Sequence, residues 1–282
     1  WVVCTHFNPG RFKKRCVNYE LFMSNLLRQN VPVCTVELAS SPETAERASV
    51  PIATAANATY KNIYHAVYSP SVLWAKEVLL NIGESLLPPD CRFVCWADAD
   101  LIWDKDDWAV RTAEYMSGTD SPVVIQPFEM CHQMRSGETF EKDYKHLTGD
   151  ERIKNACIPI GRHYMQCPMS FINTGEPFKY HAGYAWVIRR DILNQIGGLF
   201  EYCILGQADY CMALAFTHNN ERDRTISNDW NIDGTFNWGQ QLLNTVRDWQ
   251  RQAASVVKGR LGFLADVRVY HNFHGHPANR QY

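Results

Sequence analysis

Short apolar runs alternate with amphipathic stretches along most of this 282-residue chain. Four apolar runs bounded by polar, Gly or Pro residues are typical of buried strands: WVVCTHF, VPVCTVELA, RFVCWADAD and PVVIQPF. Helical periodicity lies between them, at 8–30, 70–88 and 106–116. The first helix has Val17, Leu21, Leu26 and Leu27 among its apolar positions. Strands that alternate with helices predict an α/β protein with βαβ units and a mostly parallel central sheet flanked by helices.

The second half of the chain is less regular. No helical or strand periodicity is visible from Cys131 to about Tyr180, or again near 218–237. Irregular stretches of this length inside a compact domain are usually functional or mobile loops. Between them, 183–198 predicts a short strand and a helix ended by Gly197 and Gly198, and 209–216 predicts another helix. A long amphipathic helix is expected at 238–259. Its inward residues are Leu242, Leu243, Val246, Trp249, Val256 and Val257.

The chain closes with a predicted strand and a His-rich tail over 265–282. We find no repeats, no low complexity and no linker, so we expect one domain over 1–282. Within it, residues 1–130 form the regular half and residues 131–282 the less regular half.

Composition narrows the function classes. The formal net charge is −2, so no bulk attraction to nucleic acid is expected. No apolar run reaches the ~18 residues of a membrane span, and no signal peptide is visible. We therefore expect a cytoplasmic protein, with a removed membrane anchor as the open alternative. Aromatic residues make up 12% of the chain, and many in polar surroundings suit stacking on sugars or bases.

The ten cysteines do not form a disulfide or zinc-ribbon pattern. Cys4, Cys34 and Cys95 lie in strand-like runs, where cysteine behaves as a small hydrophobe, and there is no C-x-x-C pair. We expect mostly free thiols and a reducing compartment. The sequon at 57–59 would matter only in a secreted protein.

Two acids, Asp98 and Asp100, end the apolar run FVCWADADLIW. Charge inside a buried segment is costly unless it is paired or bound to a metal. Ligands of open parallel sheets bind beyond the carboxyl ends of the strands, and the side-chain period of two places both acids on one side. Such carboxylates suit Mg²⁺ or Mn²⁺. The alternative is helix capping, a role that we expect of the next acids along the chain: Asp104, Asp106 and Asp107.

In this order, the motifs resemble those of the GT-A glycosyltransferases, in particular the GT2-like branch, over most of the chain. VVCTHFNP resembles the first nucleotide-binding strand and loop, and Glu37 matches an acid that contacts base or ribose. WAKEVLLNIG resembles the helix that carries a Lys and an Asn toward the nucleotide, and ADADLIW the metal motif. The segment 181–213 resembles the stretch that ends in the catalytic acid, although Ala208 stands where many relatives have a second acid. HNFHGHPANRQY resembles the tail that supplies a His to the metal.

The resemblance implies that residues 1–130 are the nucleotide- and metal-binding half and that residues 131–282 are the acceptor-binding half with a C-terminal metal-binding tail. It also implies a role for each matching residue. The metal ligands would be Asp100, Asp98 and His274. The nucleotide-binding residues would be Thr5, Phe7, Asn8, Glu37, Lys76, Asn81, Asp98 and Ala99. Donor and acceptor would contact His181, Gly183, Trp186, Gln207 and Trp238. His276 and Arg280 would bind the phosphates of the donor.

The catalytic base would be Asp209. The alternative for Asp209 is a plain helix N-cap, and the two roles are compatible, because the helix dipole keeps such a carboxylate ionised and a general base must be ionised. Strand alternation separates His271 from His274, so we favour His274, although the choice among the tail histidines stays open. A His ligand favours Mn²⁺ over Mg²⁺. A zinc hydrolase would need three ligands, and no H-E-x-x-H stands near these histidines. Lys76 falls in mid-helix, where a Lys is usually solvated.

The implied function is a metal-dependent, inverting transfer of a sugar from a nucleotide-diphosphate donor to a hydroxyl acceptor on a glycan or glycoconjugate. A UDP-sugar is favoured over a GDP-sugar. Two alternatives stay open: a sugar nucleotidyltransferase, although its Gly-rich phosphate loop is missing, and a non-catalytic carbohydrate-binding module, which has no need of acids at a strand end.

Overall fold

The structure is a computed structural model, and its described residues cover most of the chain. They are 1–8, 10–39, 41–43, 45, 62–71, 73, 75–147, 156–166, 181–204, 206–217 and 239–275. The predicted residues Trp238, His276 and Arg280, the sequon and most of the two irregular stretches lie outside these ranges.

The first half of the chain follows the predicted alternation of strands and helices. Its elements are β1 (Val2–His6), α1 (Lys13–Arg28), β2 (Val33–Ala39), β3 (Ile63–Tyr68), α3 (Lys76–Ser85), β4 (Phe93–Ala97), β5 (Leu101–Trp103), α4 (Trp108–Tyr115) and β6 (Val124–Gln126). Strands β3 and β5 were not predicted, and β5 is only three residues long, which is too short to show a period.

The second half adds short elements that the sequence pattern did not reveal and longer ones that it did. The short ones are β7 (Met130–Gln133), the π-helix η1 (Phe140–Tyr144), β8 (Ala156–Cys157), α5 (Ile160–Gln166) and β10 (Leu261–Phe263). The predicted ones are β9 (Ala185–Arg189), α7 (Arg190–Ile196), α8 (Ala208–Thr217), α10 (Gln240–Val257) and β11 (Arg268–His271). Helix α7 ends as expected, with Gly197 at φ 87°.

A seven-stranded, mostly parallel sheet organises the molecule in the order β10-β6-β9-β4-β1-β2-β3. Strand β9 alone among these described strands runs antiparallel, between β4 and β6. Because β9 and β10 come from the second half of the chain, one sheet unites both halves. The predicted α/β class with a mostly parallel central sheet is confirmed.

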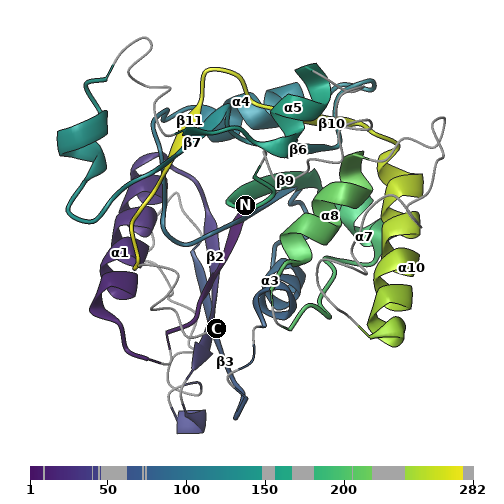
Figure 1. Cartoon of the computed structure of the whole chain (residues 1–282), viewed down its shortest axis with the longest axis horizontal. Coiled ribbons are helices and arrows are strands. Elements are labelled where there is room, and N and C mark those ends of the chain that lie inside the picture. The colour runs from purple at the N-terminus through teal and green to yellow at the C-terminus, as the bar shows by residue number, and fades with distance from the viewer. Residues whose placement is uncertain are drawn as a thin grey trace.

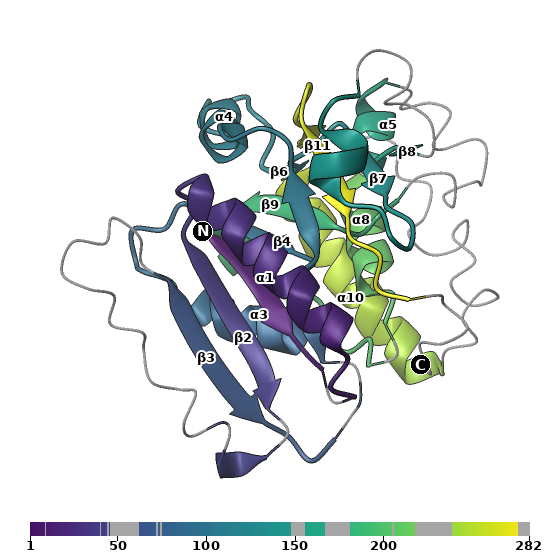
Figure 2. The same cartoon turned by 90° about the vertical axis from the view of Figure 1, so that its left-hand side faces the viewer.

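Helices cover both faces of this sheet, with α1 on one side and α3 and α10 on the other (Figures 1 and 2). The strand period of two explains the two cores: Val2 and Cys4 pack on the α1 side, and Val3 packs on the α3 side. In α10, Leu243, Val246 and Val257 are buried, and the predicted Leu242, Trp249 and Val256 pack against the same core.

Helix α1 buries Leu26, as predicted, but not the other apolar residues that the sequence indicates. Val17 and Leu21 are 44% and 42% exposed, whereas Asn18 and Asn25 are buried. The buried amides donate to the main-chain carbonyls of Phe273 and Trp103. Hydrogen bonding to backbone, not apolar contact alone, therefore orients this helix.

A second, four-stranded sheet in the order β5-β11-β7-β8 lies against the first. In it β11 pairs antiparallel with β5, and His271 lies opposite Leu101. This pairing brings the C-terminal segment to the residues that directly follow β4, which are about 170 positions earlier in the chain.

Three expectations about local structure need correction. Lys76 is the first residue of α3 and not a mid-helix residue. Asp107 precedes α4, but its side chain makes no capping hydrogen bond. Asp104 instead accepts from the Arg268 main chain, and Asp106 pairs with Arg28. These acids find basic or main-chain partners from other elements, which residue type alone does not reveal.

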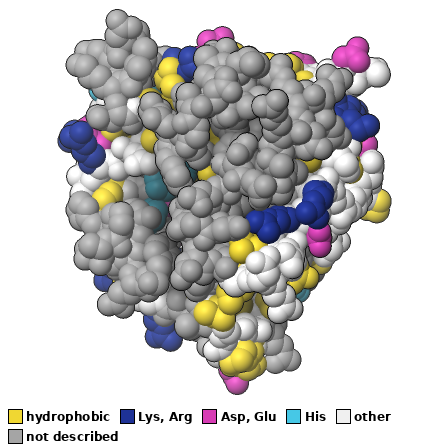
Figure 3. Space-filling model, turned by 45° about the vertical axis from the view of Figure 1, so that its right-hand side comes forward, with side chains coloured by type: hydrophobic (Ala, Val, Ile, Leu, Met, Phe, Trp, Pro, Cys, Tyr) yellow, Lys and Arg dark blue, Asp and Glu magenta, His cyan; other side chains and the backbone are white. Residues whose placement is uncertain are grey.

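All nine cysteines in the described ranges are free thiols, as expected. The described helices include none with the length and apolarity that crossing a lipid bilayer requires. On the face shown in Figure 3, the described basic, acidic and apolar side chains are interspersed, in keeping with the small net charge.

Candidate active site

A cavity of about 290 Å³ opens at the carboxyl ends of β1 and β4. This is the edge at which ligands of open α/β sheets bind. Nine of the predicted site residues line it: Thr5, Phe7, Lys76, Asp98, Ala99, Asp100, Gln207, Asp209 and His274. Residues from five separate segments of the chain therefore converge on one space.

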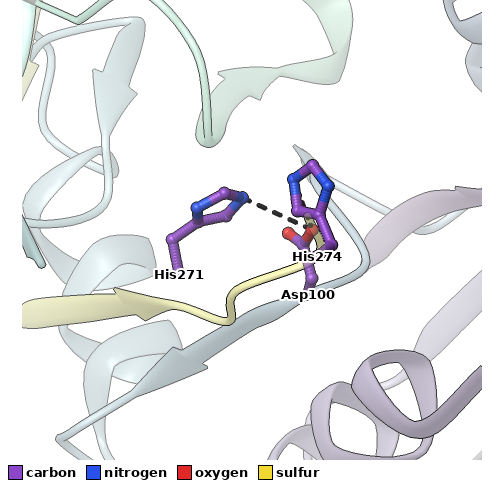
Figure 4. A group of neighbouring side chains, drawn as sticks. All are labelled: Asp100, His271 and His274. Atoms are coloured by element: carbon purple, nitrogen blue, oxygen red, sulfur yellow. Dashed lines mark ion pairs between the residues drawn. The ribbon is translucent and has the colours of Figure 1, made fainter. Parts of the chain in front are cut away.

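Asp100, His271 and His274 form a compact cluster at this cavity (Figure 4). The Asp100 Oδ2 atom lies 3.4 Å from His271 Nε2 and 3.6 Å from His274 Nε2. One ligand atom from each of the three residues lies within 4.8 Å of the others. Both tail histidines thus reach the carboxylate. The alternation argument that separated them is wrong, because β11 ends at His271 and the chain turns before His274.

The cluster fits a divalent cation. The second carboxylate oxygen of Asp100, Oδ1, is buried and has no hydrogen-bond partner among the described residues, an arrangement that a bound cation would satisfy. Burial acts to raise the pKa of Asp100, but the adjacent imidazoles bring that pKa below its ordinary value. Carboxylate and imidazole together suit Mn²⁺, Fe²⁺ or Zn²⁺ better than Mg²⁺.

Asp98 has a different partner from Asp100. Its Oδ1 atom accepts a short hydrogen bond from Lys76 Nζ, and it is not part of the cluster around Asp100. Residues 98–100 form a turn between β4 and β5, so strand alternation does not apply there. Burial acts to lower the pKa of Lys76, but the nearby carboxylates raise it overall. Lys76 is therefore a firmly charged cation in the cavity.

Asp209 lies in the first turn of α8, and its Oδ1 accepts from the Tyr210 main chain. A Cβ atom on Gly183 would come within 2.9 Å of Asp209 Oδ2, so only a glycine allows this close approach. The His181 ring lies at the same glycine, and its Nδ1 accepts from the Gly183 N–H. Burial lowers the pKa of His181. Gly183, which shortly precedes β9 in the sequence, thus lies next to the predicted catalytic acid, with the His181 ring beside it.

Glu77 is a buried carboxyl in the cavity that the sequence analysis did not name. It is 4% exposed, and burial raises its pKa from about 4.5 to about 7, against the opposing charge of Lys76. Between about pH 4.5 and about pH 7, Glu77 therefore keeps its proton in the folded protein but has lost it in the unfolded chain. The contribution of the Glu77 proton to the stability of the folded protein is complete below about pH 4.5 and is lost as the pH rises through about 7.

This predicts the pH dependence of stability in a Glu77→Gln variant. Between about pH 4.5 and about pH 7, wild-type stability should fall relative to the variant by at most about 3 kcal/mol. Denaturant unfolding in the presence of a chelator, at several pH values across this range, measures the difference. A constant difference between the two proteins would contradict the prediction.

Two predicted nucleotide-binding residues, Asn8 and Glu37, line a neighbouring hollow that shares Phe7 with the first cavity. Glu37 Oε1 lies 3.7 Å from His6 Nδ1. The two hollows share His6, Phe7 and Leu38 and therefore lie side by side at the end of β1.

Two other predicted residues lie elsewhere. Asn81 bonds to the Leu199 main chain and to Glu201, which connects α3 to the segment after α7. Trp186 is 1% exposed, and its Nε1 donates to the Ala182 carbonyl in the core. The structure places both in scaffold contacts.

Four polar residues of the cavity were missed: His6, Arg15, Asn18 and Glu77. His6 follows Thr5 in a segment already assigned to the nucleotide, so its position was a usable signal. Arg15 and Asn18 lie on a helix that sequence periodicity described only by its apolar residues. Arg15 Nη1 donates to the Phe7 carbonyl at 2.7 Å, and no local pattern predicts that contact.

The chain matches no protein-family model and no curated protein sequence. Among solved structures it is similar to S. aureus TarS in complex with UDP-GlcNAc, at 11% identity and a TM-score of 0.50. That similarity covers 100% of this chain and 60% of the TarS chain. It is also similar to a Drosophila β1,4-galactosyltransferase 7 mutant in complex with manganese, UDP-Gal and xylobiose, at 11% identity and a TM-score of 0.36, over 76% and 59% of the two chains. The chain has the GT-A fold of nucleotide-sugar glycosyltransferases.

Proposed function

We propose that this chain is a metal-dependent, inverting glycosyltransferase that moves a sugar from a UDP-sugar to a hydroxyl group of a glycan or glycoconjugate. One observation carries the proposal. Asp100, His274 and Asp209 line a single cavity at the strand ends of a GT-A fold, and His271 joins the first two in a cluster that could hold a cation. A cation site and a candidate base in one space are the two groups that such a transfer needs.

The charge of the cavity supports a divalent ion and a diphosphate together. Its described lining holds the carboxyl groups of Glu77, Asp98, Asp100 and Asp209 against the cations of Arg15 and Lys76. When bound by Asp100, His271 and His274, a divalent ion supplies positive charge where the leaving diphosphate becomes negative. Lys76 adds a fixed cation beside that position.

Asp209 is proposed as the general base. A carboxylate in the first turn of α8 is stabilised in its charged form by the helix dipole, and a base must be ionised to accept the acceptor proton. Attack from the face opposite the departing diphosphate inverts the anomeric carbon, which becomes oxocarbenium-like as the bond breaks. His181 and Gly183, which contact the Asp209 region, are proposed to line the sugar position together with Gln207.

The nucleotide is proposed to lie along the end of β1, where Thr5, Phe7, Asn8 and Glu37 line the two contiguous hollows. Ala99, between the two acids, would contact the same nucleotide. The similarity to TarS, whose structure holds UDP-GlcNAc, supports a uridine nucleotide over a guanosine nucleotide. Trp238, His276 and Arg280, outside the described residues, stay proposals for acceptor and phosphate contacts, as does a cytoplasmic location.

The experiment that tests this function is a donor panel. We expect slow release of UDP from one UDP-sugar in the presence of Mn²⁺, because water replaces the missing acceptor, and no release after chelation. Coupled detection of nucleoside diphosphate measures it. A protein that instead releases pyrophosphate when supplied with UTP and a sugar 1-phosphate would be a nucleotidyltransferase. Sugar binding without any release would indicate a carbohydrate-binding module.

The choice of metal is a separate prediction. Because two imidazoles and one carboxylate compose the cluster, Mn²⁺ should support donor hydrolysis better than Mg²⁺. A titration of both ions at fixed donor concentration compares them. Donor-independent ester or amide hydrolysis with Zn²⁺ would favour a zinc hydrolase and contradict the transferase assignment.

A further inference from the structure

Asn18 is a polar residue that is almost completely buried. It lies on α1, is 1% exposed and lines the cavity that holds Asp100 and His274. Burying an amide costs free energy unless its donor and acceptor ends are both satisfied. The partners of its two ends therefore show what it does.

The donor end of Asn18 reaches the C-terminal segment. Its Nδ2 donates to the Phe273 carbonyl at 3.2 Å, across 255 positions of sequence. Phe273 directly precedes His274. On the other side of Phe273, Asn272 donates twice to the Asp100 carbonyl, from its main chain and from its side chain, at 2.9 Å each. The segment that carries both histidines is thus held from two sides, by the turn after β4 and by helix α1.

The acceptor end of Asn18 has no such partner in the part of the fold that the structure describes. Its Oδ1 is buried and has no hydrogen-bond partner among the described residues. Asn25, seven residues or about two turns later on the same face, provides a comparison. Its Nδ2 donates to the Trp103 carbonyl at 3.2 Å, and its Oδ1 accepts from the Trp103 N–H at 2.9 Å. Asn25 is therefore fully satisfied by the fold, whereas Asn18 keeps an acceptor for what fills the cavity.

We propose that Asn18 is a positioning residue of the metal site, which ties helix α1 to His274 through Phe273 and accepts a hydrogen bond from an O–H group of the bound ligand. The O–H donor is a water on the cation or a hydroxyl of the nucleotide. This inference rests on the proposed metal site. It adds a link from helix α1 to the tail histidine.

The test is metal binding without turnover. Mn²⁺ affinity of the full chain is measured by calorimetry or electron paramagnetic resonance for wild type, Asn18→Ala and the matched control Asn25→Ala. Loss of a group that orients a ligand costs about 10–100-fold in metal affinity, so we expect at least a tenfold loss in Asn18→Ala. Asn25→Ala should lower the melting temperature and leave Mn²⁺ affinity unchanged.

A double-mutant cycle with His274→Ala separates positioning from general structure. If Asn18 acts through His274, Asn18→Ala should cost little further affinity once His274 is absent. Additive losses would overturn the positioning role. Asn18→Ser replaces Asn18→Ala in every arm if the latter fails to fold, because the shorter side chain also cannot reach Phe273.

Adding UDP identifies the O–H donor. An unchanged UDP affinity at saturating Mn²⁺ in Asn18→Ala assigns the donor to a water on the cation, and a weakened one assigns it to the nucleotide. Wild-type protein that binds no Mn²⁺ would overturn both the metal site and this inference. Wild-type binding with equal binding by Asn18→Ala would overturn this inference and leave the proposed function standing.

Discussion

Replacement of Asp209 by Asn should lower the rate of sugar transfer by roughly 10²–10⁴-fold, the usual contribution of a positioned general base. The amide keeps the size of the side chain and can still accept from the Tyr210 main chain, but it cannot take a proton from the acceptor hydroxyl. UDP affinity should stay nearly constant, because the proposed nucleotide contacts lie at β1, β2, α3 and the 98–100 turn and do not include Asp209. Turnover with the active donor, together with calorimetric titration of UDP, measures both quantities.

Asp248→Asn is the matched control for this variant. Asp248 is an exposed acid on α10 that pairs with Arg251 on the same helix, and exposed pairs of this kind contribute little. The control should transfer sugar at the wild-type rate. Equal activity in Asp209→Asn and wild type would remove Asp209 from the mechanism, whereas a loss of UDP affinity would show that it binds the donor.

Replacement of Asp100 by Ala should abolish the effect of Mn²⁺ on UDP binding. Asp100 supplies the carboxylate of the cluster and is the member that both histidines approach. The loss should reach at least about tenfold in Mn²⁺ affinity. The C-terminal segment should stay in place in the variant, because Asn272 is anchored by the main-chain carbonyl of Asp100 and not by its side chain. Calorimetry with UDP, in the presence and absence of Mn²⁺, gives the result.

Asp106→Ala serves as the control for Asp100→Ala. Asp106 is an exposed acid that pairs with Arg28 at 2.6 Å, away from the cavity lining. Its loss should leave Mn²⁺-dependent binding intact. An Asp100→Ala protein whose UDP affinity still rises with Mn²⁺ would show that the cation is held elsewhere, with Asp98 as the next candidate.

Much of the fold could be predicted because long elements carry a clear period. The 18 residues of α10 present Leu243, Val246 and Val257 at helical spacing, and β1, β2 and β4 are continuous apolar runs. Strands β5 and β10 contain three residues each, which is less than two periods, and were not predicted. The equally short β6 was predicted because it lies inside the longer apolar run PVVIQPF. The formation of β5 and β10 depends on partner strands that lie far away in the sequence.

The candidate site divides in a similar way. Asp98, Asp100 and Asp209 were found because they directly follow a predicted strand or open a predicted helix. His271 was set aside because strand alternation was continued past the end of β11, where the chain no longer obeys it. Arg15, Asn18 and Glu77 were missed because a polar residue on a helix gives no sign of whether it faces solvent or a cavity.

By itself, the sequence determined the α/β class, the order of the main elements and the strand end that carries the acids, since these depend on local periodicity and on residue type. Tertiary structure alone decided which acid meets the histidines and which meets Lys76. It also decided that a helix near the start of the chain holds the segment near its end. These contacts join positions between 22 and 255 residues apart, and no local pattern encodes which distant group a buried polar side chain will find.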